Sequence, residues 1–357
     1  MKREGCYYQS QMASVDKTWE IITSTNIGFD LGMFNNTLTL SAEYYWKKND
    51  NMLADVTLPN LVGISVPQSN VGTLKTWGWE IEVGYRNKFG EVEINATASL
   101  SDSDNKVTSY TGKNSISEGT VGIIEGYPLN SIWGYRTDGM WQSRDEYLAY
   151  KAAHPGYESF NDAKVSGGDI RYVAQGDGAH TIGQGGGTPD EPGDLVYLGS
   201  SNSRYFYTFS VGANWRGFDF NIMFQGVGKR KVYVEPDQLA PLKNTYDMPW
   251  TIHTDYWTED NPNASLPRLY SGTNFNYKAS DRWVQDGSYL RLKNVTLGYT
   301  IPLPKKAIER LRVYISGDDV WEHTNMLKVF DPEVGDKPSA NYYPFFRTWT
   351  FGINLTL

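Results

Sequence analysis

The sequence predicts an all-β fold, an antiparallel transmembrane β-barrel meander of about eleven strands with long extracellular loops. One observation is a repeated alternation of apolar and polar residues, as in 349–357, where Phe351, Ile353 and Leu355 alternate with Gly352 and Asn354. A period of two over this length is typical of a strand with one apolar face. The other observation is that short and long connections alternate, as periplasmic turns and extracellular loops do in outer-membrane barrels.

Composition limits the alternatives. In the 357 residues, no apolar run approaches the ~20 residues that a transmembrane helix needs. A net charge of −8 argues against nucleic-acid binding, which needs a basic surface. The single cysteine, Cys6, excludes an internal disulfide and a CxxC motif.

The strands are predicted in order from the alternation. Two hairpins come first, with arms at 19–33 and 38–46 and then at 77–85 and 92–100. The other predicted strands are 120–125, 131–141, 205–215, 218–224, 288–301, 311–315 and 349–357. A slip of phase near Lys293–Asn294 predicts a bulge.

The longer connections contain fewer sequence patterns that predict secondary structure. Ser143–Glu146 is a capping box, so a short helix is predicted over 145–153, at the start of an insert that runs to about residue 204. Further loops are predicted at about 52–73, 234–285 and 318–345, and a compact turn at 302–310.

The apolar faces of the clearly alternating strands carry no Asp, Glu, Lys or Arg. An Arg or Lys at a lipid-facing position in mid-membrane would cost ~2–4 kcal/mol, so lipid exposure requires this absence. A soluble β-sandwich could show the same alternation, and the alternating loop lengths favour the membrane.

An odd meander has parallel end strands, and open sheet edges are not tolerated in lipid. The N-terminal residues 1–8 also lack the apolar core of a signal peptide. We therefore expect partner strands and an export signal upstream of this sequence.

A series of short motifs now resembles a known family, the SusC/RagA-type TonB-dependent outer-membrane transporters of the Bacteroidetes. The motifs occur in order over nearly the whole chain: 19–28, Asn70–Gly72, Gly126–Leu129, Gly134–Gly139, Gly193–Gly199, Phe224–Gly228, Asn261–Arg268, Tyr289–Asn294, Asp331–Gly335 and Arg347–Leu355.

The resemblance implies that residues 1–357 are the C-terminal part of the receptor barrel, the second half of about twenty-two strands. The plug domain and first half of the barrel would precede it. It also implies uptake of oligosaccharides or peptides with a SusD-like surface lipoprotein, driven by TonB–ExbB–ExbD through the missing N-terminal region. Membrane lipid is an expected partner and nucleic acid is not.

No catalytic residues, cofactor or metal site are predicted. The four histidines (His154, His180, His253 and His323) have no metal-ligand spacing, so solvated loop positions are expected for them. The segment Ala174–Gly178, which includes Asp177, keeps only part of the oxygen-ligand pattern of a calcium loop.

The candidate substrate contacts lie in the loop 241–285, which is rich in aromatic residues. Exposed aromatic rings often mark binding surfaces. We select Trp250, Tyr256 and Trp257, with Arg268 as a polar partner. The loop also contains Tyr246, Tyr270, Tyr277 and Trp283. The alternatives are that these aromatics pack the loop itself or contact the lipoprotein.

Two other functions stay open from sequence alone. A passive outer-membrane porin would need no plug domain, and a soluble β-rich carbohydrate-binding protein would need no detergent. An upstream plug-coding sequence separates the transporter from the porin.

Overall fold

The structure is a computed structural model that describes residues 17–56, 67–112, 114–235, 239–242, 249–272, 275–304, 308–335, 343 and 345–357. The predictions for residues 1–8, Cys6 and Tyr246 lie outside the described residues, as do parts of the loop at 52–73 and of the turn at 302–310.

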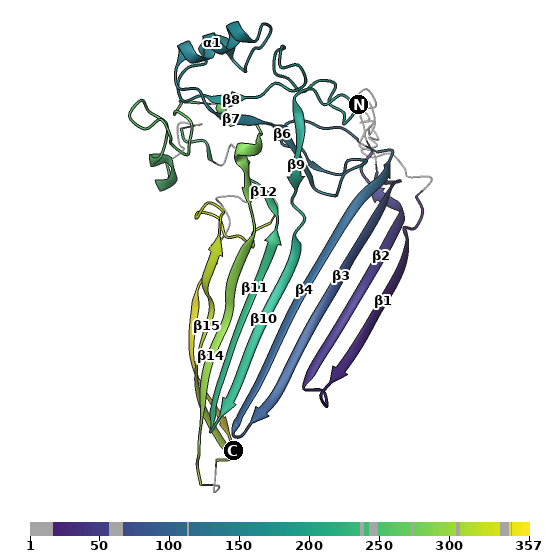
Figure 1. Cartoon of the computed structure of the whole chain (residues 1–357), viewed down its shortest axis with the longest axis vertical. Helices are drawn as coiled ribbons and strands as arrows, with labels where there is room; N and C mark the ends of the chain where they lie inside the picture. Colours follow the sequence, from purple (N-terminus) through teal and green to yellow (C-terminus); the bar gives the residue numbers. More distant parts are fainter. Residues whose placement is uncertain are drawn as a thin grey trace, which may run out of the picture.

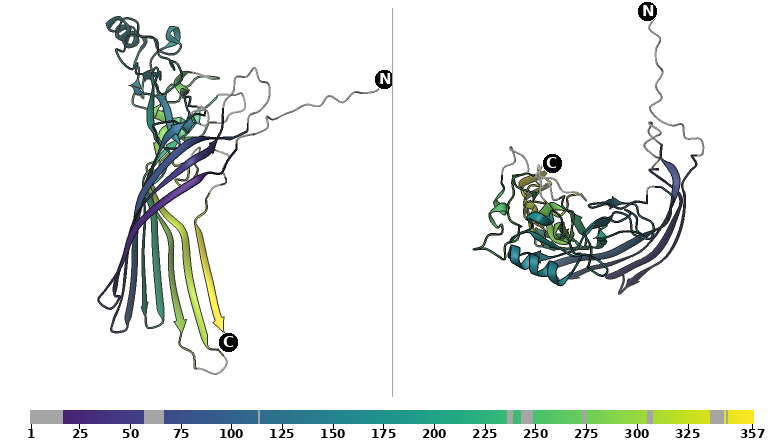
Figure 2. Two further views of the ribbon diagram at one scale, coloured as in Figure 1. Left: turned by 90° about the vertical axis from the view of Figure 1, so that its right-hand side faces the viewer. Right: turned by 90° about the horizontal axis from the view of Figure 1, so that it is seen from above.

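A long antiparallel sheet, called the barrel sheet here, dominates the fold (Figure 1). Its nine strands lie in sequence order, so the predicted antiparallel meander is confirmed. The strands are β1 (Ile21–Met33), β2 (Leu38–Ala54), β3 (Ser69–Phe89), β4 (Val92–Tyr110), β10 (Arg204–Trp215), β11 (Phe218–Lys229), β14 (Tyr289–Ile301), β15 (Arg310–Thr324) and β16 (Thr348–Thr356). Figure 2 shows that the sheet curves like part of a cylinder wall, with a convex and a concave side.

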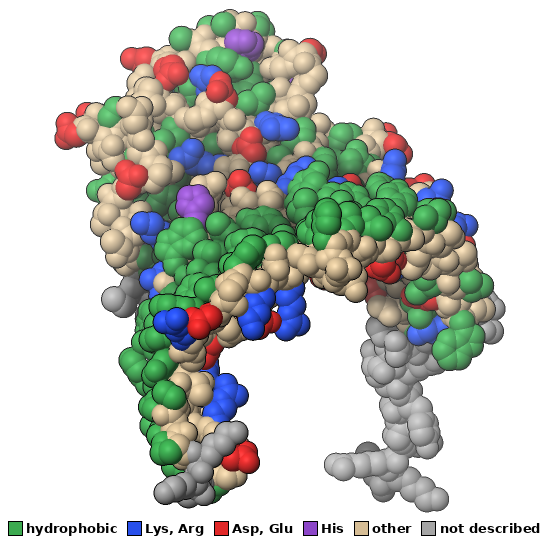
Figure 3. Space-filling model, turned by 60° about the horizontal axis from the view of Figure 1, so that its bottom comes forward, with side chains coloured by type: hydrophobic (Ala, Val, Ile, Leu, Met, Phe, Trp, Pro, Cys, Tyr) green, Lys and Arg blue, Asp and Glu red, His purple; other side chains and the backbone are tan. Residues whose placement is uncertain are grey.

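The register places apolar side chains on one face. Ala42 lies opposite Phe29 and Ile81, and Ile81 lies opposite Leu100. Phe220 and Leu297 continue this face in the second half of the sheet. Figure 3 shows hydrophobic side chains spread over the convex side and charged side chains within the curve. The large apolar side chains on this face are exposed; Phe351 and Ile353, for example, are 79% and 71% exposed.

The concave face is polar. Ser41 lies opposite Asp30 and Glu82, and Glu82 lies opposite Ser99. An apolar exterior around a polar interior is the inverse of a soluble protein and is typical of a membrane barrel. The predicted faces are therefore confirmed by the register.

The lower hairpins in Figure 1 are tight. Arg216 and Gly217 join β10 to β11 with φ of 46° and 88°. Positive φ at both central residues is the geometry of a type I′ turn, whose twist matches that of the flanking strands. The predicted bulge is also confirmed, because the register of β14 against β15 shifts between Leu292 and Asn294.

The long connections gather at the other end and form a second body, the loop domain, from described residues of 111–203, 230–287 and 325–335. It contains β5 (Val121–Gly122), β6 (Ser131–Tyr135), β7 (Thr137–Met140), α1 (Arg144–Ala153), β8 (Ile170–Tyr172), β9 (Leu195–Ser200), β12 (Lys231–Tyr233) and β13 (Val284–Asp286). Four 3₁₀ turns complete it, at Asp162–Lys164, Thr251–Thr254, Phe275–Tyr277 and Asp281–Trp283.

The loop domain corrects the predicted strand count. The strands predicted at 120–125 and 131–141 belong to small sheets in this domain, so the barrel sheet has nine strands among the described residues rather than eleven. All five residues of β6 are buried. A strand buried on both faces loses the period of two, and apolar content alone does not show which sheet it joins.

The predicted helix is confirmed as α1. Its N-cap Ser143 accepts a hydrogen bond from the backbone N–H of Glu146, and the Glu146 carboxylate accepts one from the N–H of Gln142. Together these satisfy donors that a helix start leaves free. Among the described residues, no helix is both long and apolar enough to span a membrane.

Candidate functional site

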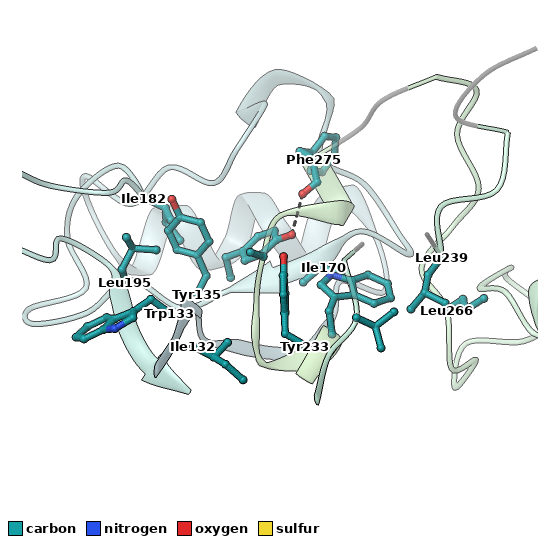
Figure 4. Close-up of a cluster of buried hydrophobic side chains, with 14 of the residues drawn as sticks. Ile132, Trp133, Tyr135, Ile170, Ile182, Leu195, Tyr233, Leu239, Leu266 and Phe275 are labelled. Carbon is teal, nitrogen blue, oxygen red and sulfur yellow. Dashed lines mark hydrogen bonds between the residues drawn. The ribbon is translucent and has the colours of Figure 1, made fainter. Parts of the chain in front are cut away.

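The loop domain has its own hydrophobic core, which joins segments far apart in sequence. Figure 4 shows Ile132, Trp133 and Tyr135 of the β6 strand near Leu195 and Tyr233. Tyr172 donates a hydrogen bond from its hydroxyl to the carbonyl of Phe275, at 2.8 Å. This core fixes the loop 241–285 against the insert 143–204, and it therefore sets where the candidate site residues lie.

A buried carboxylate supports the same junction. Asp169 is fully buried and accepts hydrogen bonds from the Asn276 amide at 2.9 Å and the Tyr270 hydroxyl at 3.0 Å. The Arg268 guanidinium lies 3.7 Å from it. Burial raises the pKa of Asp169, and these hydrogen bonds and the arginine oppose that rise. Asp169 therefore orients Arg268, which is one of the predicted site residues.

Trp257 and Arg268 are brought together by two glycines. The Trp257 ring packs on Gly167 and Gly168. An added Cβ at Gly167 would lie 2.6 Å from the indole, and one at Gly168 would collide with the indole and lie 2.8 Å from the Arg268 Cβ, so only glycine allows these contacts. The Trp257 indole N–H donates to the Gln142 side chain at 3.3 Å. Arg268 donates to the Gly167 carbonyl at 3.4 Å, and its guanidinium lies 4.5 Å from the centre of the Tyr270 ring. Both side chains stay partly exposed, which leaves a face of each available to a ligand.

Trp250 and Tyr256 have different surroundings. Trp250 packs partly buried against the core of the loop domain and stacks on His253, with ring centres 5.7 Å apart. Tyr256 also packs on that core, and its backbone bridges to Leu266. Among the described residues, no hydrogen bond or ring contact joins either side chain to Trp257 or Arg268. Their contacts are those of side chains that pack a loop.

His253 differs from the prediction of a solvated loop histidine. It is 5% exposed, with Nδ1 accepting the N–H of Trp250 at 2.7 Å and Nε2 lying 2.8 Å from the carbonyl of Leu239. This geometry requires the neutral imidazole with the proton on Nε2. The prediction was wrong because nearby turns fold back over this residue, which local sequence does not show.

His180 lies between two carboxylates. Its Nε2 is 2.9 Å from buried Asp194 and its Nδ1 is 3.4 Å from exposed Asp177. The hydrogen bond to Asp194 raises the pKa of His180. Within the described part of the chain, no three His, Cys, Asp or Glu side chains gather as a metal site. Asp177 instead caps the turn by accepting the N–H of Ala179 at 3.1 Å.

Sequence reasoning missed the polar residues that hold this region. Asp169 and Asn276 are 107 residues apart, and Arg291, which pairs with Asp331 at 2.5 Å, is 40 residues from its partner. Each contact joins segments that are far apart in the sequence, so no local pattern predicts it. The one signal in the sequence is the position of Asp169, an acidic residue between Gly168 and the apolar Ile170.

Comparisons with known proteins agree with this geometry. No protein-family profile matches the sequence. The chain is 27% identical to "TonB-dependent receptor P26" of Formosa agariphila, over 95% of this chain and 35% of that protein. It is 24% identical to "TonB-dependent receptor SusC" of Bacteroides thetaiotaomicron, over 94% of this chain and 32% of that protein.

Solved structures show the same fold. The structure titled "Structure of the RagAB peptide importer in the 'open-open' state" matches with a TM-score of 0.73 and 22% identity, over 96% of this chain and 35% of that chain. "Structure of the RagAB peptide transporter" matches with a TM-score of 0.72 and 23% identity, over 94% and 35%. The chain thus spans about a third of the length of its relatives.

The fold defines a class, an outer-membrane β-barrel of which this chain supplies part of the wall and its loops. Within that class, the resemblance to SusC/RagA-type TonB-dependent transporters that the sequence predicts is confirmed by the relatives. The predicted location in the outer membrane is confirmed with it, and the relatives are receptors and transporters rather than enzymes.

Proposed function

We propose that this chain forms the C-terminal part of the barrel of a TonB-dependent outer-membrane transporter, with uptake driven by TonB–ExbB–ExbD. The observation that supports this most directly is the apolar convex face of the nine-stranded barrel sheet, in a chain similar to TonB-dependent receptors. The strands β1 and β16 are the edges of that sheet. Because bare edges are not tolerated in lipid, further strands close the barrel around a plug domain.

The proposed cargo is an oligosaccharide or a peptide, delivered together with a SusD-like surface lipoprotein. Similarity to SusC and to the RagAB peptide importer supports this pairing. The concave wall that the cargo would pass is polar, with rows of hydroxyl and carboxylate side chains such as Ser41, Glu82 and Ser99. A polar wall suits a hydrated cargo of either class.

Uptake of labelled oligosaccharides and labelled peptides, in cells with and without TonB, tests this function. The full-length transporter should import one of the two classes, and loss of TonB should abolish that import. Import that persists without TonB would favour a passive porin and would contradict the proposal.

Of the four candidates Trp250, Tyr256, Trp257 and Arg268, the proposed substrate contacts are Trp257 and Arg268. Trp257 and Arg268 support this best, because they are adjacent, partly exposed and held by Gly167. An aromatic face beside a guanidinium suits stacking on a sugar ring or a peptide side chain, with a hydrogen bond alongside. Trp250 and Tyr256 pack on the loop-domain core and act by holding the loop.

Two substitutions separate contact from packing. Trp257→Ala should weaken cargo binding about fivefold, because an aromatic contact contributes about 1 kcal/mol, with surface level and lipoprotein binding unchanged. Trp250→Ala should lower loop stability and surface level together. If the Trp257→Ala variant no longer binds the lipoprotein but keeps normal affinity for free cargo, this surface contacts the lipoprotein instead.

A further inference from the structure

Three lysines lie directly opposite one another on neighbouring strands of the barrel sheet. The register pairs Lys48 of β2 with Lys75 of β3, and Lys75 with Lys106 of β4. All three are exposed. Like charges that lie directly opposite on one face destabilise a sheet, so the arrangement needs an explanation. We call these residues the lysine row.

The lysine row lies on the convex face of the sheet. Two residues along each strand, Trp46 lies opposite Trp77, and both tryptophans are exposed on the apolar face. Side chains two residues apart on a strand share a face. The lysines therefore point outward, toward the membrane, rather than into the polar interior.

Their height places them at the edge of the apolar band. From Leu38 at the lower hairpin to Trp46 the strand is ~26 Å long. A strand tilted by ~40° rises ~20 Å over that length, so Trp46 lies near the top of a lipid-facing band ~25 Å tall. Aromatic side chains form the border of that band, and here Tyr44, Trp46, Trp77 and Trp79 occupy it. The lysine row is two residues further along the strands, ~5 Å higher toward the loop domain. At ~25 Å above Leu38 it lies at the border between the apolar band and the lipid headgroups.

Nearby carboxylates leave part of this charge unpaired. Lys48 pairs with Asp50 at 2.9 Å. Asp102 and Asp104 are the acidic neighbours on β4, and both are bonded to Arg204. Within the described ranges, Lys75 and Lys106 form no ion pair. Two neighbouring ammonium groups thus face outward without an acidic partner.

We propose that the lysine row binds the phosphate group of an anionic membrane lipid, whose acyl chains lie along the apolar face beside Trp46 and Trp77. A phosphate between Lys75 and Lys106 would offset the repulsion between them. Lysine suits this role because its ammonium is a point charge on a flexible stem that reaches a headgroup. This lipid site lies on the membrane-facing surface and is independent of the cargo.

The strand β2 offers a matched control. Lys47 is the next residue to Lys48 but points to the concave face, where its ammonium lies 4.8 Å from the centre of the Tyr45 ring. Replacing Lys47 removes the same charge at the same height, but on the concave face of the sheet. It therefore separates a lipid site from a general effect of net charge.

The test is native mass spectrometry of the full-length transporter, titrated with short-chain phosphatidic acid or with phosphatidylcholine of the same chain length. The intact protein should bind phosphatidic acid more tightly. The double change K75Q and K106Q should weaken that binding roughly thirtyfold, because each lysine near an anionic surface contributes about fivefold. K47Q should bind as the unchanged protein does.

Several results would overturn the proposal. Equal binding of the two lipids would do so, as would an equal loss in K47Q. Displacement of phosphatidic acid by inorganic phosphate at similar concentration would show a free-phosphate site instead. Should the double variant not assemble, K106Q alone decides: a loss of about fivefold supports the site, and unchanged binding contradicts it.

Discussion

The carboxylate of Asp169 accepts a hydrogen bond from the side-chain amide of Asn276, 2.9 Å away and 107 residues further along the chain. Asn276 also accepts, through its amide oxygen, the backbone N–H of Ile170 at 2.8 Å. One asparagine thus joins two consecutive residues of the insert 143–204 to the loop that carries Trp257 and Arg268. The position of the candidate site depends on this contact.

Asn276→Asp is expected to loosen the loop domain. The change keeps an acceptor for Ile170 but replaces the donor to Asp169 with a second buried carboxylate, so about 1–3 kcal/mol of local stability should be lost. Hydrogen exchange at the Ile170 N–H, in the full-length transporter, measures this. Exchange at the barrel strand β3 is the internal control and should not change. Unchanged exchange at Ile170 would show that the contact is not important for stability.

The segment around His180 should be more stable at low pH. The pKa of His180 is raised by Asp194, so the folded state binds a proton more tightly than the unfolded state does. The resulting stabilisation is fully present below the ordinary pKa of about 6.5 and is lost as the pH rises through the raised value. Asp177 and Asp194 are the acidic groups that face the ring.

Limited proteolysis of the full-length transporter between pH 6 and pH 8 checks this prediction, with cleavage read near Gly183, whose N–H donates to Asp194 at 2.8 Å. Cleavage should increase with pH in the unchanged protein, relative to a reference peptide, and should depend little on pH in His180→Gln. The same pH profile in both proteins would rule out His180 as the titrating group.

The two faces of β11 should tolerate a cation differently. Phe220→Arg places a charge on the convex face and should cost ~2–4 kcal/mol of barrel stability in lipid. Asn221→Arg places the charge on the concave face, opposite Gly212 and Thr296, and should reduce barrel stability less. The fraction of assembled, heat-resistant barrel in outer membranes measures both. Equal losses would mean that the faces are assigned incorrectly.

The chain of residues 1–357 should not form a transporting pore alone. Its described strands give a sheet of nine with β1 and β16 as edges, and an odd antiparallel meander brings its end strands together in parallel. The expected result is no stable single-channel conductance from the detergent-purified chain in planar bilayers. Steady conductance from a monomer would contradict this expectation and the proposed need for partner strands.

Sequence alone predicted the wall better than the loops, for a physical reason. In β2, β4 and β10, one face meets lipid and the other meets water, so the period of two appears in the residues themselves. In the loop domain, Trp133 and Tyr135 are buried on all sides, and apolar content does not specify which partner covers them. The register that aligns Lys48, Lys75 and Lys106 depends on strand pairing, which no single strand reveals.

The candidate site could likewise be predicted only in part from the sequence. An aromatic-rich loop was visible in the sequence, and Trp257 and Arg268 do lie together. What placed them there, Gly167 beneath the indole and Asp169 beside the guanidinium, comes from a segment about 90 to 100 residues earlier. Contacts at that separation are set by the folded core rather than by local pattern.

Spin-label accessibility along β11 measures directly whether the convex face of the barrel sheet contacts lipid. Single cysteines at 218 to 224, in the full-length transporter with Cys6 replaced by serine, are labelled in lipid bilayers, and collisions with oxygen and with a water-soluble nickel complex are measured. We expect a period of two, with positions 220 and 222 accessible to oxygen and positions 219 and 221 accessible to nickel. Equal nickel accessibility at all these positions would contradict it.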